Sequence, residues 1–304
     1  MRFFKMAAFA AVLFSVFFIK NSSVALASNG DDESINEKYG LPVVVYGAQL
    51  SPSQKEEVRK LLNVTDTSKV NEITVIGQDL ATYIKGDPNA HMYSSAKITR
   101  KDPGTGLIIH QVTPENITEV TNEMYANALL TAGVKDAVVD IASPVKVSGH
   151  SALVGIYKAY DQGKGGTALN KDRTEVANEE LNLATNLAKN DGVDKDKVGQ
   201  LLTDIKKEIA VQKPATKDDI AKIIDDKLKS LKITLSPEDR QLLIDLFDKM
   251  RHLNINFDNA KSQLDHLSQD IQQRIKETVG DKNFLQKVGD FFKKLFDSIK
   301  SLFS

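Results

Sequence analysis

One serine stands where a hydrolase nucleophile would be expected, between a predicted strand and a predicted helix. The segment Gly149-His150-Ser151-Ala152-Leu153 begins like the Gly-x-Ser-x-Gly elbow of α/β hydrolases. Leu153 replaces the second glycine, which the strained turn of such an elbow needs. A serine at the start of a helix more commonly caps the free N–H groups of the first turn. We therefore predict that Ser151 caps a helix and is not a nucleophile.

A second segment resembles a calcium-binding loop. Asp194 and Asp196 fit the first and third positions of an EF-hand, and Gly199 fits the sixth. Val198 offers no side-chain oxygen at the fifth position, and Ile205 stands where a bidentate glutamate is needed. Too few oxygens remain for calcium, so we predict that Asp194 caps the helix that follows.

Other reactive residue types do not form a recognisable site. The histidines are scattered and form no His-Glu-x-x-His motif (His91, His110, His150, His252 and His266). The chain has no cysteine, which excludes thiolate zinc sites, iron–sulfur clusters and thiol nucleophiles. The acidic pairs Asp218-Asp219 and Asp225-Asp226 fall on the polar face of a predicted helix and are expected to be solvated. We predict no catalytic residue, metal or cofactor.

The charge balance excludes a further class of function. Lys and Arg number 40 and Asp and Glu 41, so no overall field attracts nucleic acid, and we expect no nucleic-acid partner. Apolar residues make up 41% of the chain, which is typical of a globular core.

The N-terminus has the pattern of a secretory leader. Arg2 and Lys5 precede an apolar run, Met6–Ile19, and Ala25-Leu26-Ala27 matches a signal-peptidase site. The run is about 14 residues long, shorter than the ~20 residues that span a bilayer. We predict a signal peptide over residues 1–27, with an uncleaved anchor as the alternative, and a flexible arm over residues 28–40.

The elements that would position any site change character half-way along the chain. Strands are predicted at 43–46, 73–76, 95–101, 107–112 and 137–141, with a possible extension at 145–147. Helices are predicted to begin at Ser51-Pro52, to cover 78–85, to run from Thr113-Pro114 to about Thr131 before Gly133, and to cover 151–160. Turn residues from Asp102 to Gly106 favour a hairpin between the third and fourth strands.

The second half has only helical periodicity. Five amphipathic stripes follow the glycine-rich break at 163–167, and Ser236-Pro237 begins the fourth. We predict an α+β fold in which an α/β domain with a mixed sheet (41–162) is joined by a linker (163–170) to a helical domain (171–279).

The last segment, 280–304, is predicted to be an amphipathic Phe-rich helix. Lysines lie opposite its apolar face, an arrangement typical of helices that lie on a membrane surface. Docking of the same face on the protein core is the alternative. The predicted membrane or partner contacts are Phe284, Leu285, Val288, Phe291, Phe292, Leu295, Phe296, Ile299, Leu302 and Phe303.

Three stretches together resemble a known family. They are Val45–Ser51, Ile109–Tyr160 and Ile233–Leu267, with Met124-Tyr125-Ala126-Asn127-Ala128 and Val147-Ser148-Gly149 among the most specific matches. The sequence is similar to the YpuA-like family of exported Gram-positive proteins, a domain of unknown function. The resemblance implies export and a C-terminal aromatic segment, and it implies no activity, cofactor or catalytic residue.

These observations favour an exported binding or interaction protein associated with the cell envelope. It would be secreted or attached to the outer face of the cytoplasmic membrane, with the membrane surface or an envelope protein as its partner. The alternative is a cell-wall or lipid-modifying enzyme whose site the sequence does not identify.

Overall fold

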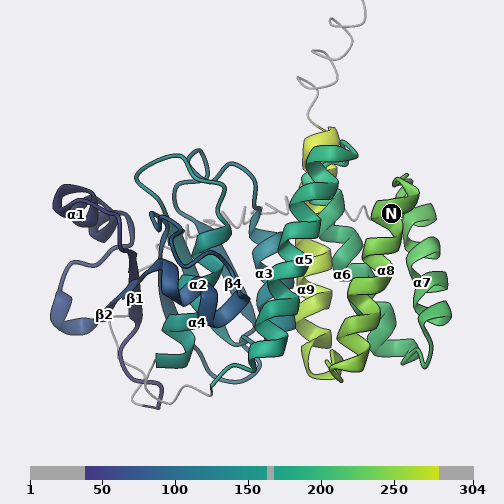
Figure 1. Ribbon diagram of the computed structural model, residues 1–304, viewed down its shortest axis with the longest axis horizontal. Coiled ribbons are helices and arrows are strands. Elements are labelled where there is room, and N and C mark those ends of the chain that lie inside the picture. The colour runs from purple at the N-terminus through teal and green to yellow at the C-terminus, as the bar shows by residue number, and fades with distance from the viewer. Residues whose placement is uncertain (1–37, 163–167, 281–304) are drawn as a thin grey trace, which may run out of the picture. The chain divides into compact units, whose positions relative to one another are not determined.

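The computed structural model describes residues 38–162 and 168–280, drawn in colour in Figure 1. These residues belong to one compact unit. The predicted leader (1–27), the Phe-rich contact residues from Phe284 to Phe303 and residues 163–167 lie outside the described residues. Predictions about them, and about the domain boundaries, therefore stay predictions.

A mixed five-stranded sheet forms the first half, in the order β2-β1-β3-β5-β4. Its strands are β1 (Val43–Gly47), β2 (Asn71–Val75), β3 (Ser95–Arg100), β4 (Leu107–Gln111) and β5 (Ala137–Ala142). Strand β1 pairs parallel with β2 and antiparallel with β3, and β5 pairs antiparallel with β3 and parallel with β4. The predicted α+β fold with a mixed sheet is confirmed.

The predicted hairpin between β3 and β4 is wrong. Both strands exist, but β5 lies between them, and Ala137 stands opposite Arg100 on one side and Leu107 on the other. The connecting loop crosses the start of β5, where Asp136 Oδ1 accepts hydrogen bonds from the N–H groups of Gly104 (2.9 Å) and Gly106 (3.0 Å). The turn residues therefore carry the chain across the start of β5, and they do not join β3 and β4 as a hairpin.

The predicted start of a helix at Thr113-Pro114 is also wrong. Helix α3 (Asn122–Ala132) begins after Thr121, whose hydroxyl accepts the N–H of Met124 at 3.3 Å. Thr113 Oγ1 instead accepts the N–H of Ser143 at 2.9 Å, which ties the end of β4 to the end of β5. The predicted helix end is confirmed, because Gly133 caps α3 with a φ of 96°.

Helices cover both faces of the sheet. On one face, α4 (His150–Gln162) packs on β1 and β3, α3 packs on β4, and α2 (Gly77–Ile84) lies beside α4. On the other face, α1 (Pro52–Leu61) buries Val58 against Val44 and Tyr46 of β1. The sequence predicts the start of α1, since Ser51 caps it and Pro52 is its first residue.

Five helices follow, as the amphipathic stripes predict. They are α5 (Lys171–Asn190), α6 (Lys195–Gln212), α7 (Lys217–Leu231), α8 (Pro237–His252) and α9 (Lys261–Gly280), with short 3-10 turns η1 (Thr67–Lys69) and η2 (Asp258–Ala260) elsewhere. Helix α3 packs against α5, α6 and α9, so one apolar core runs from the sheet into the helical layer.

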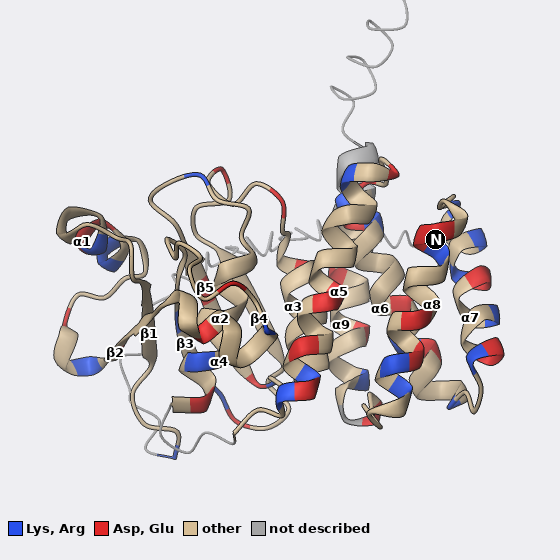
Figure 2. Ribbon diagram, viewed as in Figure 1, with Lys and Arg blue, Asp and Glu red and all other residues tan. Residues whose placement is uncertain are grey.

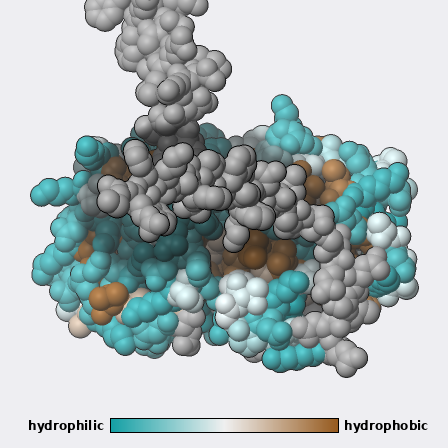
Figure 3. Space-filling view, turned by 180° about the vertical axis from the view of Figure 1, so that it is seen from behind, coloured by the Kyte–Doolittle hydropathy of each residue, from teal (hydrophilic) through white to brown (hydrophobic). Residues whose placement is uncertain are grey.

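The surface of the described residues has no strong charge field. Lysine and arginine alternate with aspartate and glutamate along α7 and α8 (Figure 2). On the opposite side of the molecule, apolar side chains appear in small areas among hydrophilic ones (Figure 3). Within the described residues, every helix is too short or too polar to cross a membrane.

Candidate functional site

The structure does not assemble a nucleophile elbow at Ser151. Its hydroxyl donates to Ser94 Oγ at 3.2 Å and not to an imidazole. The ring of His150 instead faces Ser148 Oγ and Thr185 Oγ1, both at 3.2 Å, and burial lowers the pKa of this histidine. The N-cap prediction is wrong as well, because α4 already begins at His150.

Packing explains the glycine of this segment. Gly149 has a φ of 108°, and a Cβ there would lie 2.7 Å from the Tyr125 hydroxyl and 2.8 Å from Ile117 Cγ2. Tyr125 also donates to the carbonyl of Gly149 at 2.6 Å. The segment therefore holds α3 against the start of α4, which is a structural role.

Two of the acidic residues singled out in the sequence have structural roles, one as a helix cap and one as the partner of an arginine. Asp194 Oδ1 accepts the N–H groups of Asp196 (3.0 Å) and Lys197 (3.2 Å), which confirms its predicted role as the cap of α6. Asp225 forms a bidentate pair with Arg240, both contacts at 2.7 Å. Among the described residues, no group of three or more His, Asp or Glu side chains is placed to hold a metal ion.

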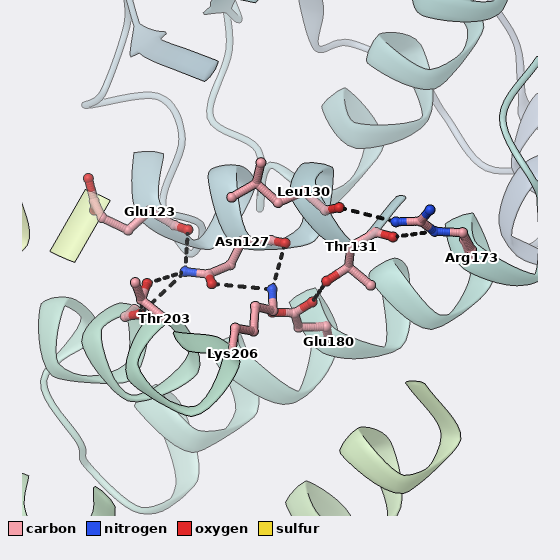
Figure 4. Close-up of polar contacts among 9 residues, drawn as sticks. Glu123, Asn127, Leu130, Thr131, Arg173, Glu180, Thr203 and Lys206 are labelled. Carbon is pink, nitrogen blue, oxygen red and sulfur yellow. Dashed lines mark hydrogen bonds and ion pairs between the residues drawn. The ribbon is translucent and has the colours of Figure 1, made fainter. Parts of the chain in front are cut away.

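The densest group of buried polar side chains lies where α3, α5 and α6 meet (Figure 4). We call it the interhelix polar cluster, and its members are Asn127, Thr131, Glu180, Thr203 and Lys206. Lys206 Nζ donates to Glu180 Oε1 at 2.5 Å and to the Asn127 carbonyl at 2.7 Å. Thr131 Oγ1 donates to Glu180 Oε2 at 2.6 Å, and Asn127 Nδ2 donates to Thr203 Oγ1 at 2.9 Å.

Both charges of this cluster are removed from solvent. The side chain of Lys206 is 0% exposed and that of Glu180 is 1% exposed. Burial lowers the pKa of Lys206, while the Glu180 carboxylate acts in the opposite direction. Each oxygen of Glu180 already accepts a hydrogen bond, so a substrate has neither access nor a free partner here. The interhelix polar cluster fixes the orientation of three helices.

A charged row crosses the second face of the sheet, on β3, β5 and β4. Asp140 lies 3.5 Å from Lys97 Nζ and 3.0 Å from His110 Nδ1. A carboxylate in this position favours the tautomer that leaves Nε2 available as a base. His110 is exposed, and two exposed apolar side chains stand two residues before and after it, Ile108 of β4 and Val112 just beyond the end of β4.

A cavity of about 310 Å³ lies among the ends of α6, α7 and α8, and we call it the α6–α8 cavity. Its apolar wall is formed by Ile209, Ile220, Phe247, Met250, Ile255 and Phe257. Its polar rim is formed by Lys213, Arg251, Asn254, Asn256 and Asp258. An apolar wall with a few polar groups is typical of small-molecule sites.

A surface ion pair joins two segments of the rim of the α6–α8 cavity. Lys213 Nζ lies 3.0 Å from Asp258 Oδ2, and this contact holds the pKa of Asp258 below its usual range. Lys213 is the left-handed C-cap of α6, which places its side chain between the end of that helix and η2. At the inner side, the Phe257 ring lies 5.6 Å from Lys206 Nζ, so this ring separates the cavity from the interhelix polar cluster.

Comparison with known proteins places the sequence in a family. Residues 46–267 match the family described as "Protein of unknown function (DUF1002)". The chain belongs to this family. It is also 38% identical, over 267 residues, to the protein described as "Uncharacterized protein YpuA" of Bacillus subtilis (strain 168), a match that covers 86% of this chain and 89% of that protein. No solved structure matches the chain.

The DUF1002 match spans all of the features described above. The interhelix polar cluster, the charged row on the sheet and the α6–α8 cavity all lie between residues 46 and 267. The resemblance to the YpuA-like family noted in the sequence is thereby confirmed. The match assigns no chemistry, so the function has to be argued from the geometry.

The sequence pattern does not reveal these three features. His110 and Asp140 meet because β5 pairs with β4, a pairing that the sequence pattern does not indicate. Lys206 follows Ile205 at the edge of an apolar stripe, where a lysine is normally solvated. Phe257 lies in the loop before η2 and helps to form the cavity, a position that helical periodicity does not predict.

Proposed function

We propose that this DUF1002 chain is an exported, envelope-associated binding protein. The observation that carries the proposal is the α6–α8 cavity, because its wall is apolar and its rim polar. Such a site binds a ligand by burying apolar surface, and its rim groups orient the ligand. The leader pattern over residues 1–27 supports export, and the Phe-rich segment supports attachment to a membrane surface.

An enzyme remains the second candidate, and one feature favours it. The His110–Asp140 pair has the carboxylate–imidazole arrangement of a general base. Its surroundings favour binding instead, since exposed apolar side chains stand two residues before and after His110 and Lys97 shares the Asp140 carboxylate. We therefore rank a cell-wall or lipid-modifying enzyme below a binding protein.

Two measurements test the proposal, namely where the protein is found in the cell and whether it carries a bound small molecule. In cells that express the whole chain, we expect the protein in the envelope fraction, with an N-terminus near Ser28 by mass spectrometry. Deletion of residues 281–304 is expected to move most of it into the medium. Mass spectrometry of the purified protein under native and denaturing conditions is expected to show a bound small molecule that is released on denaturation.

The variant Ala210→Leu tests the cavity, because its larger side chain fills part of the cavity from the α6 side. This variant is expected to reach the envelope normally and to lose the bound molecule. A cytoplasmic protein with its N-terminus intact would refute export. An envelope fraction that is unchanged by the deletion would refute attachment through the Phe-rich segment, and equal cargo in the wild type and Ala210→Leu would refute the cavity as the binding site.

A further inference from the structure

A second hollow, of about 360 Å³, adjoins the mouth of the α6–α8 cavity. It is lined by Gln212, Lys213, Pro214, Ala215, Asp219 and Lys222. Lys213 and Pro214 line both hollows, so the two spaces are adjacent and one ligand can reach from the apolar cavity to the polar one. We call the second space the polar hollow.

The volume of the cavity limits the apolar part of a ligand. Its 310 Å³ corresponds to about ten non-hydrogen atoms if each takes the ~30 Å³ of a liquid water molecule. The wall is formed by Ile, Phe and Met side chains that come from three helices and the loop after α8. A short aliphatic chain of about this size therefore fills the apolar part of the cavity.

The charges of the polar hollow favour an anion. Its lining carries two lysines and one carboxylate, and Lys222 Nζ lies 3.7 Å from that carboxylate, Asp219, so Lys213 is the cation that a ligand can engage. The Asp219 side chain is held in place, because its Oδ2 accepts from the Thr216 hydroxyl (2.7 Å) and the Thr216 N–H (3.2 Å).

Lys213 is free to change its partner. Its side chain is 68% exposed, so its pairing with Asp258 is a surface ion pair of small net stability. An anionic head group at the junction of the two hollows would compete for the same ammonium group while the apolar chain fills the cavity. The exchange leaves Asp258 paired, since Lys261 Nζ lies 3.9 Å from its other oxygen.

We propose that the α6–α8 cavity and the polar hollow form one site for a small amphipathic anion, a free aliphatic carboxylate whose apolar chain has at most about ten carbon atoms. The chain lies in the cavity and the carboxylate binds Lys213 at the junction. This inference rests on the proposed binding function and names the ligand class of the same site.

Calorimetric titration of the delipidated full-length protein tests the ligand class with three probes of equal chain length. Octanoate is expected to bind saturably, octanol more weakly, and octylamine not measurably. Lys213→Asn is expected to weaken octanoate binding about fivefold, the upper range for an exposed ion pair, and to leave octanol binding unchanged. Asparagine tolerates the left-handed conformation of this position, where φ is 50°.

The control is Lys232→Asn, at the left-handed C-cap of α7, where φ is 54°. This substitution removes the same charge at a residue with the same backbone conformation. Lys232 lines neither hollow, so octanoate binding should equal that of the wild type. The proposal is overturned if the two variants weaken octanoate equally, if octylamine binds as tightly as octanoate, or if octanoate does not saturate. Cargo that is neutral or cationic would overturn the ligand class and leave the proposed binding function intact.

Discussion

Lys206 and Glu180 show how a buried ion pair is tolerated in an otherwise apolar interior. Each charge loses its hydration, and the loss is offset only because the lysine also reaches Asn127 and the glutamate also accepts from Thr131. The arrangement is specific, since it requires the three helices to meet in one register. It ties the second turn of α3 to the middle of α5 and α6.

Removing one partner of this pair should therefore be costly. Lys206→Met leaves the Glu180 carboxylate buried without its cation, and we expect a loss of about 3–5 kcal/mol in the free energy of unfolding. Lys206→Met combined with Glu180→Gln should recover much of that loss, because no isolated charge remains. Urea denaturation followed by circular dichroism measures both.

The adjacent residue supplies the control. Lys207 pairs with Asp265 at 2.8 Å on the surface, where the two side chains are 33% and 55% exposed. Lys207→Met should cost less than about 1 kcal/mol. Equal destabilisation by the two lysine variants would show that the buried pair does not hold the helices together.

At the scale of elements, a second polar contact joins α1 to the edge of the sheet. Arg59 of α1 holds both carboxylate oxygens of Glu72 on β2, at 2.8 and 2.9 Å, and Tyr46 donates to the same carboxylate at 2.8 Å. These hydrogen bonds, with that of Arg59 the strongest cause, lower the pKa of Glu72 below its ordinary value of 4.5. The attachment of α1 thus depends on an ionised glutamate.

The stability that this contact contributes should depend on pH. A carboxyl group whose pKa is lower in the folded protein stabilises it above the ordinary pKa and loses that effect as the pH falls through the folded value. Glu72→Gln should therefore cost about 1 kcal/mol at pH 7 and progressively less below pH 4.5. Glu57→Gln, on the exposed side of α1, is the control, and a pH-independent Glu72→Gln effect would contradict the argument.

Local elements were predictable where their signals are local. Ser51, Asp194 and Ser236 cap α1, α6 and α8 as their neighbours indicate, because capping involves only adjacent residues. The order of the strands was not predictable, since the turn at 102–106 has the same residues whether β3 pairs with β4 or with β5. Thr113 shows the same limit, because its hydroxyl binds the distant Ser143 and not the next turn of a helix.

The same distinction between local and long-range signals applies to the candidate site. Its apolar residues were recognisable as helix stripes, but the cavity arises from how the ends of α6 and α8 meet. Two left-handed residues, Lys213 and Asn254, end those helices and direct the loops around the cavity. Such geometry depends on packing between elements that are far apart in the sequence.

At the scale of the whole molecule, the sheet and the helices share one core. Helix α3 lies between them, packing on β4 with one side and on α5 and α6 with the other. Gly199 permits the close approach, because a Cβ there would lie 2.9 Å from Glu123 Cβ. We therefore expect the residues before and after the 163–167 segment to unfold in one cooperative transition.

The chain provides two independent probes of that transition. All of its tyrosines precede residue 161 and it has no tryptophan, so tyrosine fluorescence reports on the half that contains the sheet. Far-UV circular dichroism reports mainly on helices, and within the described residues α5–α9 contain most of the helical residues. Coincident midpoints in urea by the two probes are expected for a two-state transition.

A variant of the buried ion pair provides a stricter test of cooperative unfolding. Lys206 lies in α6, beyond the tyrosines, yet its partner Asn127 is in α3, within the tyrosine-containing half. Lys206→Met should therefore lower both midpoints by the same amount if the halves unfold together. If only the dichroism midpoint falls, the helical layer unfolds on its own, and the two halves are separate domains that merely contact each other through α3.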